Sequence, residues 1–353
     1  MPAQSAGKLG TVEAGRAIAA LLVVLFHAST AFIAAPHYWN RVVFGQAFDF
    51  GYAGVEFFFV LSGFIIAHVH AGDIGRPPQL RRYALRRLVR IYPVYWLVLG
   101  GVLLLTVLPL GLVRAAPPTT PVLLSSILLA GADSRPSVLV VAWTLYHEVA
   151  FYLVFGLWIL DRWLGALVSL VWLALVLARL FGVGELGFVP RYLSSEFNLL
   201  FPVGILVWWL AERAVMPWPR RVMLLAALAF AAIGYEAVFI RRWPESLEHL
   251  GFGLASALGL FAMVSAERAG QLRVPRWLVL FGGASYALYL THYSLLSLLA
   301  KLMVKAGLRD RIPAEVAFFV MVLVVVALGY GFHRLVERPM LWRLQQALGL
   351  NRR

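Results

Sequence analysis

The chain has 353 residues, of which 61% are hydrophobic and only 14% are charged. Soluble domains carry roughly 45–50% apolar and about 25% charged residues, so this composition excludes a water-soluble enzyme. The net charge of +14 comes almost entirely from arginine. Such an excess is typical of membrane-protein loops that face an anionic leaflet, and nucleic acid is a poor candidate for a partner. The chain has no cysteine, which excludes disulfides and a thiol nucleophile.

Ten apolar runs follow one another along the chain, and each is long enough, or nearly so, to cross the ~30 Å hydrocarbon core as a helix. They cover residues 17–35, 52–70, 92–113, 138–160, 163–182, 197–214, 222–240, 250–266, 278–300 and 314–336. The shorter stretch 122–130 is bounded by prolines and a glycine, which is typical of a re-entrant or interfacial segment. The sequence therefore predicts an all-α fold, a polytopic membrane helix bundle of about ten transmembrane helices. We expect one domain over residues 1–353, with spans from about 17 to 336 and no fused soluble domain.

The distribution of Lys and Arg predicts the orientation of this bundle. The N-terminus, the loops on its side and the C-terminus carry more basic residues than the loops of the opposite side. The positive-inside rule therefore predicts that both termini are cytoplasmic.

In the first run, Arg16 and His27 are eleven residues apart, which places them on one face of a helix about three turns from each other. A charged or titratable group within a span costs ~2.5–3.5 kcal/mol and is a functional hypothesis by default. An imidazole near the middle of the membrane can accept a proton from an alcohol. The alternative is an arginine that reaches the lipid headgroups and a histidine bonded to a backbone carbonyl.

The segment 76–90, between the second and third runs, contains six arginines. Such a cluster determines topology, but guanidinium groups also bind phosphate through paired hydrogen bonds. Arg82, Arg86, Arg87 and Arg90 are therefore candidates for holding the phosphates of coenzyme A. The sequence contains no phosphate-binding loop, dinucleotide fingerprint or metal motif. We expect no metal and no tightly bound cofactor.

Later runs contain further polar residues at three places. Glu148 lies about halfway along its run and needs a partner, such as Arg16, a histidine or a basic loop residue. A purely structural bridge between helices is an equal alternative. Ser285, Tyr289 and His292 share one helix face, where packing through hydroxyl groups is the alternative to a site. Glu236 also lies within a run but has no motif around it.

Several of these segments, taken in order, resemble the acyltransferase-3 family of membrane acyltransferases. The matching stretches are 13–20, 26–27, 54–64, 86–96, 143–152 and 285–292. The chain is most similar to the exopolysaccharide acetyltransferase branch, because it has the single Glu148 where many relatives have two adjacent glutamates. This difference puts any role that needs a second carboxylate in doubt.

The resemblance implies transfer of an acyl group, most often acetyl, from cytoplasmic acyl-coenzyme A to a sugar hydroxyl. The acceptor would be an extracytoplasmic or lipid-linked glycan, and the protein would lie in a bacterial inner membrane among its lipids, with polysaccharide assembly proteins as further partners. Arg16 would orient the donor, and His27 would act as general base or transient acyl carrier. Glu148 would fix a charge or tautomer near these two residues. The remaining candidates, Ser285, Tyr289 and His292, would line the path of the acceptor.

Two other classes of function remain as alternatives. In a proton-coupled transporter or flippase, Glu148, His27 and His292 would relay protons. Broken helices or internal repeats would favour a transporter, and neither is evident in the sequence. A non-catalytic subunit of a polysaccharide export complex would tolerate loss of His27, whereas a transferase would not.

Overall fold

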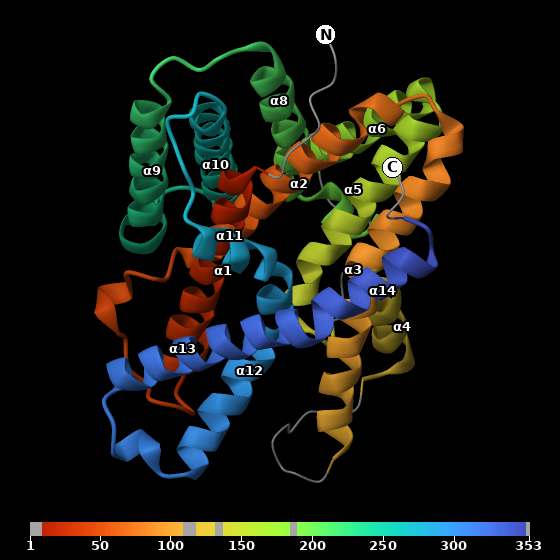
Figure 1. Ribbon diagram of the computed structural model, residues 1–353. Coiled ribbons are helices and arrows are strands. Elements are labelled where there is room, and N and C mark those ends of the chain that lie inside the picture. Colours follow the sequence, from red (N-terminus) through yellow and green to blue (C-terminus); the bar gives the residue numbers. More distant parts are fainter. Residues whose placement is uncertain (1–8, 109–117, 131–136, 184–188, 351–353) are drawn as a thin grey trace.

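The computed structural model describes residues 9–108, 118–130, 137–183 and 189–350, and these residues form helices and no strand. Within them, nine helices are long and apolar enough to cross a membrane. They contain α1 (Gly10–His27) with its π-helical continuation η1 (Ala28–Ile33), α2 (Gly54–His70), α3 (Leu80–Val107), α5 (Trp143–Leu160), α6 (Arg162–Leu180), α9 (Pro219–Tyr235), α10 (Glu245–Arg268), α12 (Ser285–Lys305) and α13 (Ala314–Phe332). The predicted all-α membrane bundle is confirmed (Figure 1).

The one remaining predicted span, 197–214, is also helical but shorter than the others. It forms the 3₁₀ turn η7 (Glu196–Leu199) followed by α8 (Leu200–Arg213). Gly63 of α2 faces the backbone of Phe201 in α8, and Gly204 of α8 faces the backbone of Val60 in α2. Small residues on both helices therefore let the two backbones approach closely, a packing mode common among membrane helices.

Two predicted boundaries are wrong. The run 92–113 becomes a helix that begins at Leu80, because the arginine-rich segment before the run is itself helical; the end of the run, from 109, lies outside the described residues. The run 278–300 is not continuous, since α11 (Arg276–Gly283) ends at Ala284 and α12 starts at Ser285. Gly282 lies directly against the backbone of Glu13, so this break brings α11 against the start of α1.

The stretch 122–130, expected to be re-entrant or interfacial, contains the short helix α4 (Thr120–Leu128). Three aromatic side chains of α3 hold its carboxyl end. The hydroxyls of Tyr95 and Tyr92 donate to the carbonyls of Ser126 and Leu128, and the Trp96 indole donates to Ile127, at 2.6–2.9 Å. These bonds satisfy carbonyls that the end of a helix leaves without partners.

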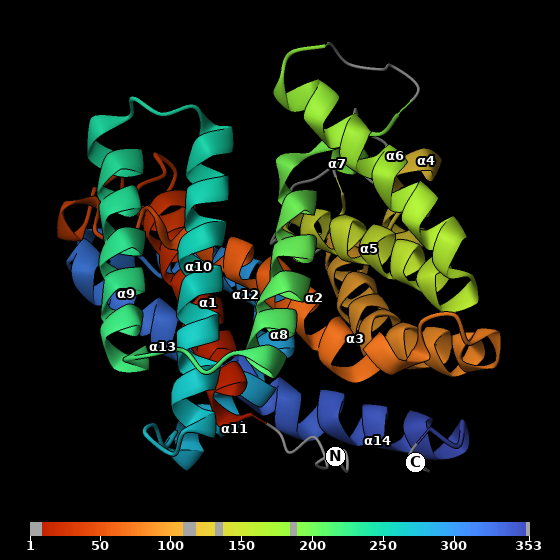
Figure 2. The same ribbon diagram turned by 90° about the horizontal axis from the view of Figure 1, so that it is seen from above.

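Two faces of the bundle can be identified from its contacts. The Glu267 carboxylate accepts hydrogen bonds from the amides of Gly10 and Thr11 at 2.8 and 2.9 Å, so α10 ends where α1 begins. Beyond α13, the π-helical η10 (His333–Glu337) leads into α14 (Arg338–Ala347), which lies along this same side (Figure 2). We call this side the α14 face. The far face contains the opposite ends of these helices, including η1, the end of α6 and the start of α10.

Candidate functional site

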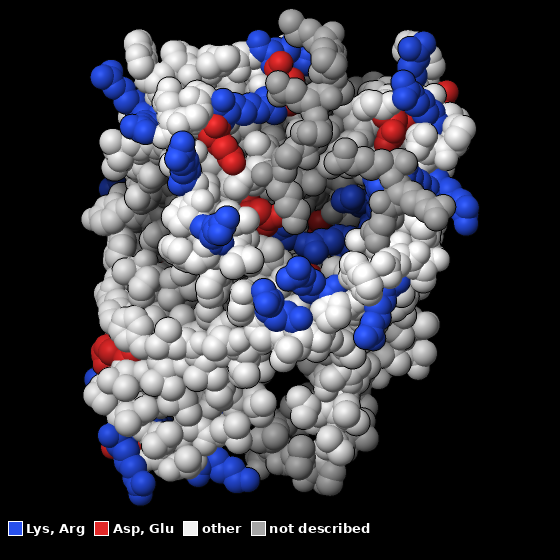
Figure 3. All heavy atoms as spheres, in the orientation of Figure 1, with Lys and Arg blue, Asp and Glu red and all other residues white. Residues whose placement is uncertain are grey.

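A cavity of about 470 Å³ lies between α1, α2, α3, α5, α12 and α14. Four arginines line it, and we call it the arginine cavity: Arg16 from α1 and Arg86, Arg87 and Arg90 from α3. Glu148, Ser285 and Tyr289 line it as well. In the space-filling view, basic side chains gather around a hollow in the middle of the surface (Figure 3). The fold thus brings together candidates from four helices that are distant in sequence.

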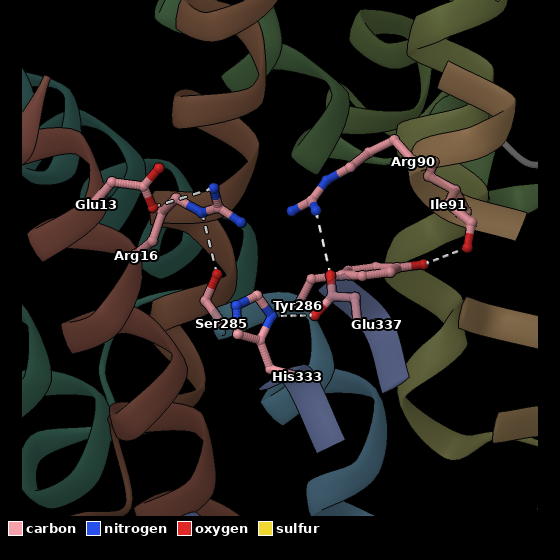
Figure 4. Close-up of polar contacts among 8 residues, drawn as sticks. All are labelled: Glu13, Arg16, Arg90, Ile91, Ser285, Tyr286, His333 and Glu337. Atoms are coloured by element: carbon pink, nitrogen blue, oxygen red, sulfur yellow. Dashed lines mark hydrogen bonds and ion pairs between the residues drawn. The ribbon is translucent and has the colours of Figure 1, made fainter. Parts of the chain in front are cut away.

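Arg16 contacts α12, a contact that the sequence did not predict. Its Nε donates to the Ser285 hydroxyl at 3.1 Å, and its Nη1 lies 3.4 Å from a carboxylate oxygen of Glu13 (Figure 4). Ser285 is the first residue of α12, so the break at Ala284 places its hydroxyl beside α1. These contacts fix the guanidinium from two sides at the cavity wall.

Arg90 is held by a carboxylate that the sequence analysis missed. Its Nη1 lies 3.3 Å from Oε1 of Glu337, which is fully buried, and the other oxygen of Glu337 contacts Nδ1 of His333 at 2.7 Å (Figure 4). The Arg90 guanidinium also lies 5.1 Å from the centre of the Tyr286 ring. The spacing of four between His333 and Glu337 is the one signal that the sequence offers for this pair.

The remaining arginines of α3 differ in their environments. Arg87 lies 5.6 Å from the centre of the Tyr152 ring, and its buried Nε has no hydrogen-bond partner within the described part of the chain. Arg86 donates to the carbonyl of Leu350 at 3.3 Å, just beyond α14. Arg82, one turn before Arg86, is not among the residues that line the cavity. Three of the four arginines predicted to hold phosphates therefore line one space.

Glu148 accepts hydrogen bonds from the hydroxyls of Tyr152, at 2.5 Å, and Ser62, at 3.3 Å. The expected ion pair with an arginine or histidine is not found among the described residues. Two hydroxyls donate to Oε1 of this carboxylate instead. Because Tyr152 also lies under Arg87, the side chains of α5 connect Glu148 to the arginines of α3.

His27 and His292 form a pair deeper in the bundle. Nε2 of His292 lies 3.2 Å from Nδ1 of His27, which also lies 2.9 Å from the carbonyl of Val23. Nδ1 of His292 lies 2.7 Å from the carbonyl of Tyr289, so it donates there and leaves Nε2 as an acceptor. His27 then donates from Nδ1 and keeps a lone pair on Nε2. The π-helix η1 begins directly after His27, and such irregular turns are frequent at functional sites.

This histidine pair is not part of the cavity lining, although Arg16 is. Tyr289 connects the two regions: it lines the cavity, its ring centre lies 5.7 Å from that of His292, and its hydroxyl lies 2.9 Å from the hydroxyl of Thr144. Arg16 thus lies in the wall of the cavity, whereas His27 lies deeper in the bundle. Both residues contact α12.

Two polar groups within the spans have structural partners. Glu236 accepts hydrogen bonds from the amides of Arg242 and Trp243 at 2.7 and 2.9 Å, and so stabilises the turn that follows η8 (Glu236–Ile240). His147 bonds to Asn198 at 2.9 Å, away from the arginine cavity. In the described ranges no three His, Cys, Asp or Glu side chains form a group that could hold a metal ion.

Comparison with known proteins shows the family of the chain. The model of a protein family described as "Acyltransferase domain", acyltransferase-3, matches residues 10–332. The chain is also 31% identical over 308 residues to the "Exopolysaccharide production protein ExoZ" of Rhizobium meliloti (strain 1021), a match that covers 85% of this chain and 92% of the relative. No solved structure matches significantly. The chain therefore belongs to the acyltransferase-3 family and is an integral membrane acyltransferase.

Proposed function

We propose that the protein transfers an acetyl group from cytoplasmic acetyl-coenzyme A to a hydroxyl of an exopolysaccharide or its lipid-linked precursor. The observation that carries this proposal is the arginine cavity, where Arg16, Arg86, Arg87 and Arg90 surround one space. Guanidinium groups bind phosphate through charge-assisted paired hydrogen bonds, and the donor carries a pyrophosphate and a 3′-phosphate. The acceptor class is supported by the similarity to ExoZ, whose name refers to exopolysaccharide production.

The residues of the cavity suit different parts of the donor. The buried Nε of Arg87 has no partner in the described part of the chain, and Arg86 lies beside α14, so both are placed to bind phosphates at the α14 face. Arg16, held by Ser285 and Glu13, is placed to orient the thioester carbonyl. No resident cofactor or metal is needed for this reaction, since the thioester itself is the activated group.

In the proposed step, the acceptor oxygen attacks the thioester carbonyl carbon, a C–O bond forms and the C–S bond breaks. The hydroxyl proton passes to Nε2 of His27, and the leaving thiolate takes up a proton. The carbonyl of Val23 and Nε2 of His292 both lie where they accept from Nδ1 of His27, which fixes the tautomer that this role requires. Tyr289 lies between the cavity and the histidine pair and would line the path along which donor and acceptor meet.

The alternatives of a transporter or a non-catalytic export subunit are less well supported. Membership of an acyltransferase family favours catalysis. Arg87, whose buried Nε has no hydrogen-bond partner among the described residues, lines a cavity suited to an anion. A proton relay would instead require titratable groups in continuous contact. The histidine pair and Glu148 have separate hydrogen-bond partners.

Binding of acetyl-coenzyme A to the purified protein tests the donor site. Arg87→Gln should weaken binding by roughly tenfold to a hundredfold, because a hydrogen bond to a charged group contributes ~1.5–3 kcal/mol. Arg81→Gln, on the same helix but exposed and outside the cavity, is the matched control and should bind normally. Isothermal titration calorimetry measures both. Equal affinity in the two variants would remove the arginine cavity from donor binding.

A further inference from the structure

A second histidine–carboxylate pair lies outside the arginine cavity. Nδ1 of His249, in α10, lies 2.6 Å from Oε1 of Glu56, in the first turn of α2. Glu56 is fully buried, and its other oxygen has no hydrogen-bond partner among the described residues. The His249 side chain keeps 19% of its surface accessible. Burying a charged group this deeply costs free energy, so its presence here indicates a role in structure or function.

The geometry fixes the orientation of the His249 ring. Because Nδ1 faces the carboxylate of Glu56, Nε2 lies at the accessible edge of the ring. Nothing in the described ranges is hydrogen-bonded to this Nε2 atom. The pair therefore presents one oriented hydrogen-bonding nitrogen to whatever approaches the ring.

The pair lies toward the far face. His249 is in the first turns of α10, while Glu267, which contacts the start of α1, is 18 residues later, ~27 Å along the helix. The arginine cavity, lined by Gln345 of α14, opens toward the other side. A ligand of His249 therefore approaches from the side opposite to the donor.

A polar cavity of about 360 Å³ lies on this face, at the start of α10. Its lining includes Glu196 of η7, Glu245 and Ser246 of α10 and Arg179 of α6. Glu245 is one helical turn before His249, and the ring of Phe197, next to Glu196, lies 4.4 Å from the His249 ring. Carboxylates, serines and an arginine thus line this space, and the His249 imidazole lies one helical turn from Glu245 and in ring contact with the neighbour of Glu196.

Aromatic rings complete the surroundings and connect them to the histidine pair of α1 and α12. Tyr52 lies 5.9 Å from His249 between ring centres, and its hydroxyl lies 3.3 Å from a carboxylate oxygen of Glu248. The Tyr52 ring lies 5.5 Å from that of Phe26, which lies 4.9 Å from that of His27. A continuous row of rings therefore leads from His249 to the proposed base.

We propose that the polar cavity of Glu196, Glu245 and Ser246, together with the His249–Glu56 pair, binds the sugar acceptor on the far face. Sugars offer many hydroxyl donors together with C–H faces that pack on aromatic rings. His249 accepts a hydrogen bond from one acceptor hydroxyl, and Glu56 is a positioning residue that acts through the imidazole. This proposal rests on the proposed function, because it assigns the acceptor site of the same reaction.

The variant His249→Asn tests the proposal. An asparagine amide can keep the hydrogen bond to Glu56 that Nδ1 makes, but it has no group in the position of Nε2. The probe is the de-acylated repeat-unit oligosaccharide from the polysaccharide of a deletion strain, and the purified protein transfers radiolabelled acetyl from acetyl-coenzyme A to it. We expect the acceptor KM to rise by about tenfold, the loss expected for one hydrogen bond, with unchanged acetyl-coenzyme A affinity.

His37→Asn, a histidine exposed beyond η1 on the same face, is the matched control and should keep the wild-type KM. Glu196→Gln provides a second arm should His249→Asn fail to fold, and it too should raise the acceptor KM. A wild-type acceptor KM in both His249→Asn and Glu196→Gln would overturn the acceptor site while leaving the proposed function intact. Absence of transfer by the wild-type protein would count against both proposals, and intact donor binding would place that failure at the acceptor.

Discussion

At the scale of single residues, the buried Glu337 gives a prediction about stability. It contacts both Arg90 and His333 and has no exposed surface. Glu337→Gln keeps the shape but removes the charge that compensates the Arg90 guanidinium. Breaking a fully buried pair costs ~3–5 kcal/mol, and the cost is smaller here because the Arg90 side chain is 34% exposed. We therefore expect a clearly lower unfolding temperature for the detergent-solubilised variant, measured by intrinsic fluorescence.

Glu212→Gln is the matched control for this experiment. It removes the partner of Arg268 in an ion pair whose side chains are 35% and 40% exposed. Exposed pairs of this kind contribute only about 0–1 kcal/mol. If both variants lost the same stability, burial would not be what makes Glu337 important.

The histidine pair gives a second prediction, about rate. His292→Asn should keep the contact with the Tyr289 carbonyl but lose the acceptor that orients Nδ1 of His27. We expect kcat for acetyl transfer to fall by roughly tenfold to a hundredfold, as losing such orienting partners typically costs, while acetyl-coenzyme A affinity stays unchanged. His147→Asn, whose Asn198 contact lies away from the cavity, is the control. A normal kcat in His292→Asn would mean that the carbonyl of Val23 orients His27 without His292.

At the scale of elements, the contact between α2 and α8 depends on two glycines. A methyl group at Gly204 would overlap the carbonyl oxygen of Val60, which is backbone and cannot move aside. Gly204→Ala should therefore destabilise the protein by about 1–3 kcal/mol. Gly100→Ala in α3 meets no atom within 4 Å and should be neutral or slightly stabilising, since alanine favours helix. Thermal unfolding of both variants separates the two outcomes, and equal stability would contradict the close packing.

The sequence predicted the helices well because lipid imposes length and apolarity on every span. The predicted boundaries were wrong where the end of an apolar run is not the end of a helix. The arginines before residue 92 lower hydropathy but favour helix, so α3 begins earlier than its apolar run. The break at Ala284 could not be predicted, because it depends on the packing of Gly282 against Glu13, which is distant in sequence.

The sequence suggested several residues that line the cavity, but it did not predict which residues contact one another. Motif resemblance identified Arg16 and Ser285, which the fold brings within 3.1 Å of each other. It missed Glu56 and Glu337, each in or beside an apolar run and each explained only by a partner from another helix. Pairing across helices is a property of the folded bundle, which one chain read linearly does not reveal.

At the scale of the whole molecule, the orientation in the membrane decides whether the arginine cavity can meet its donor. Acetyl-coenzyme A is made in the cytoplasm, so the proposed function requires the α14 face to be cytoplasmic. The chain has no cysteine, which allows labelling of single introduced cysteines without background. Gln346 on α14 and His37 beyond η1 are both exposed and lie on opposite faces.

In intact cells, a membrane-impermeant maleimide should label His37→Cys and should label Gln346→Cys only after the inner membrane is permeabilised. The expectation follows from the excess of basic residues on the side of the termini, which the positive-inside rule assigns to the cytoplasm. The cysteine-free parent serves as the blank, and mass spectrometry of the purified protein measures the labelled fraction. The reverse pattern would place Arg86 and Arg87 outside the cell, where there is no coenzyme A, and the donor site would have to be abandoned.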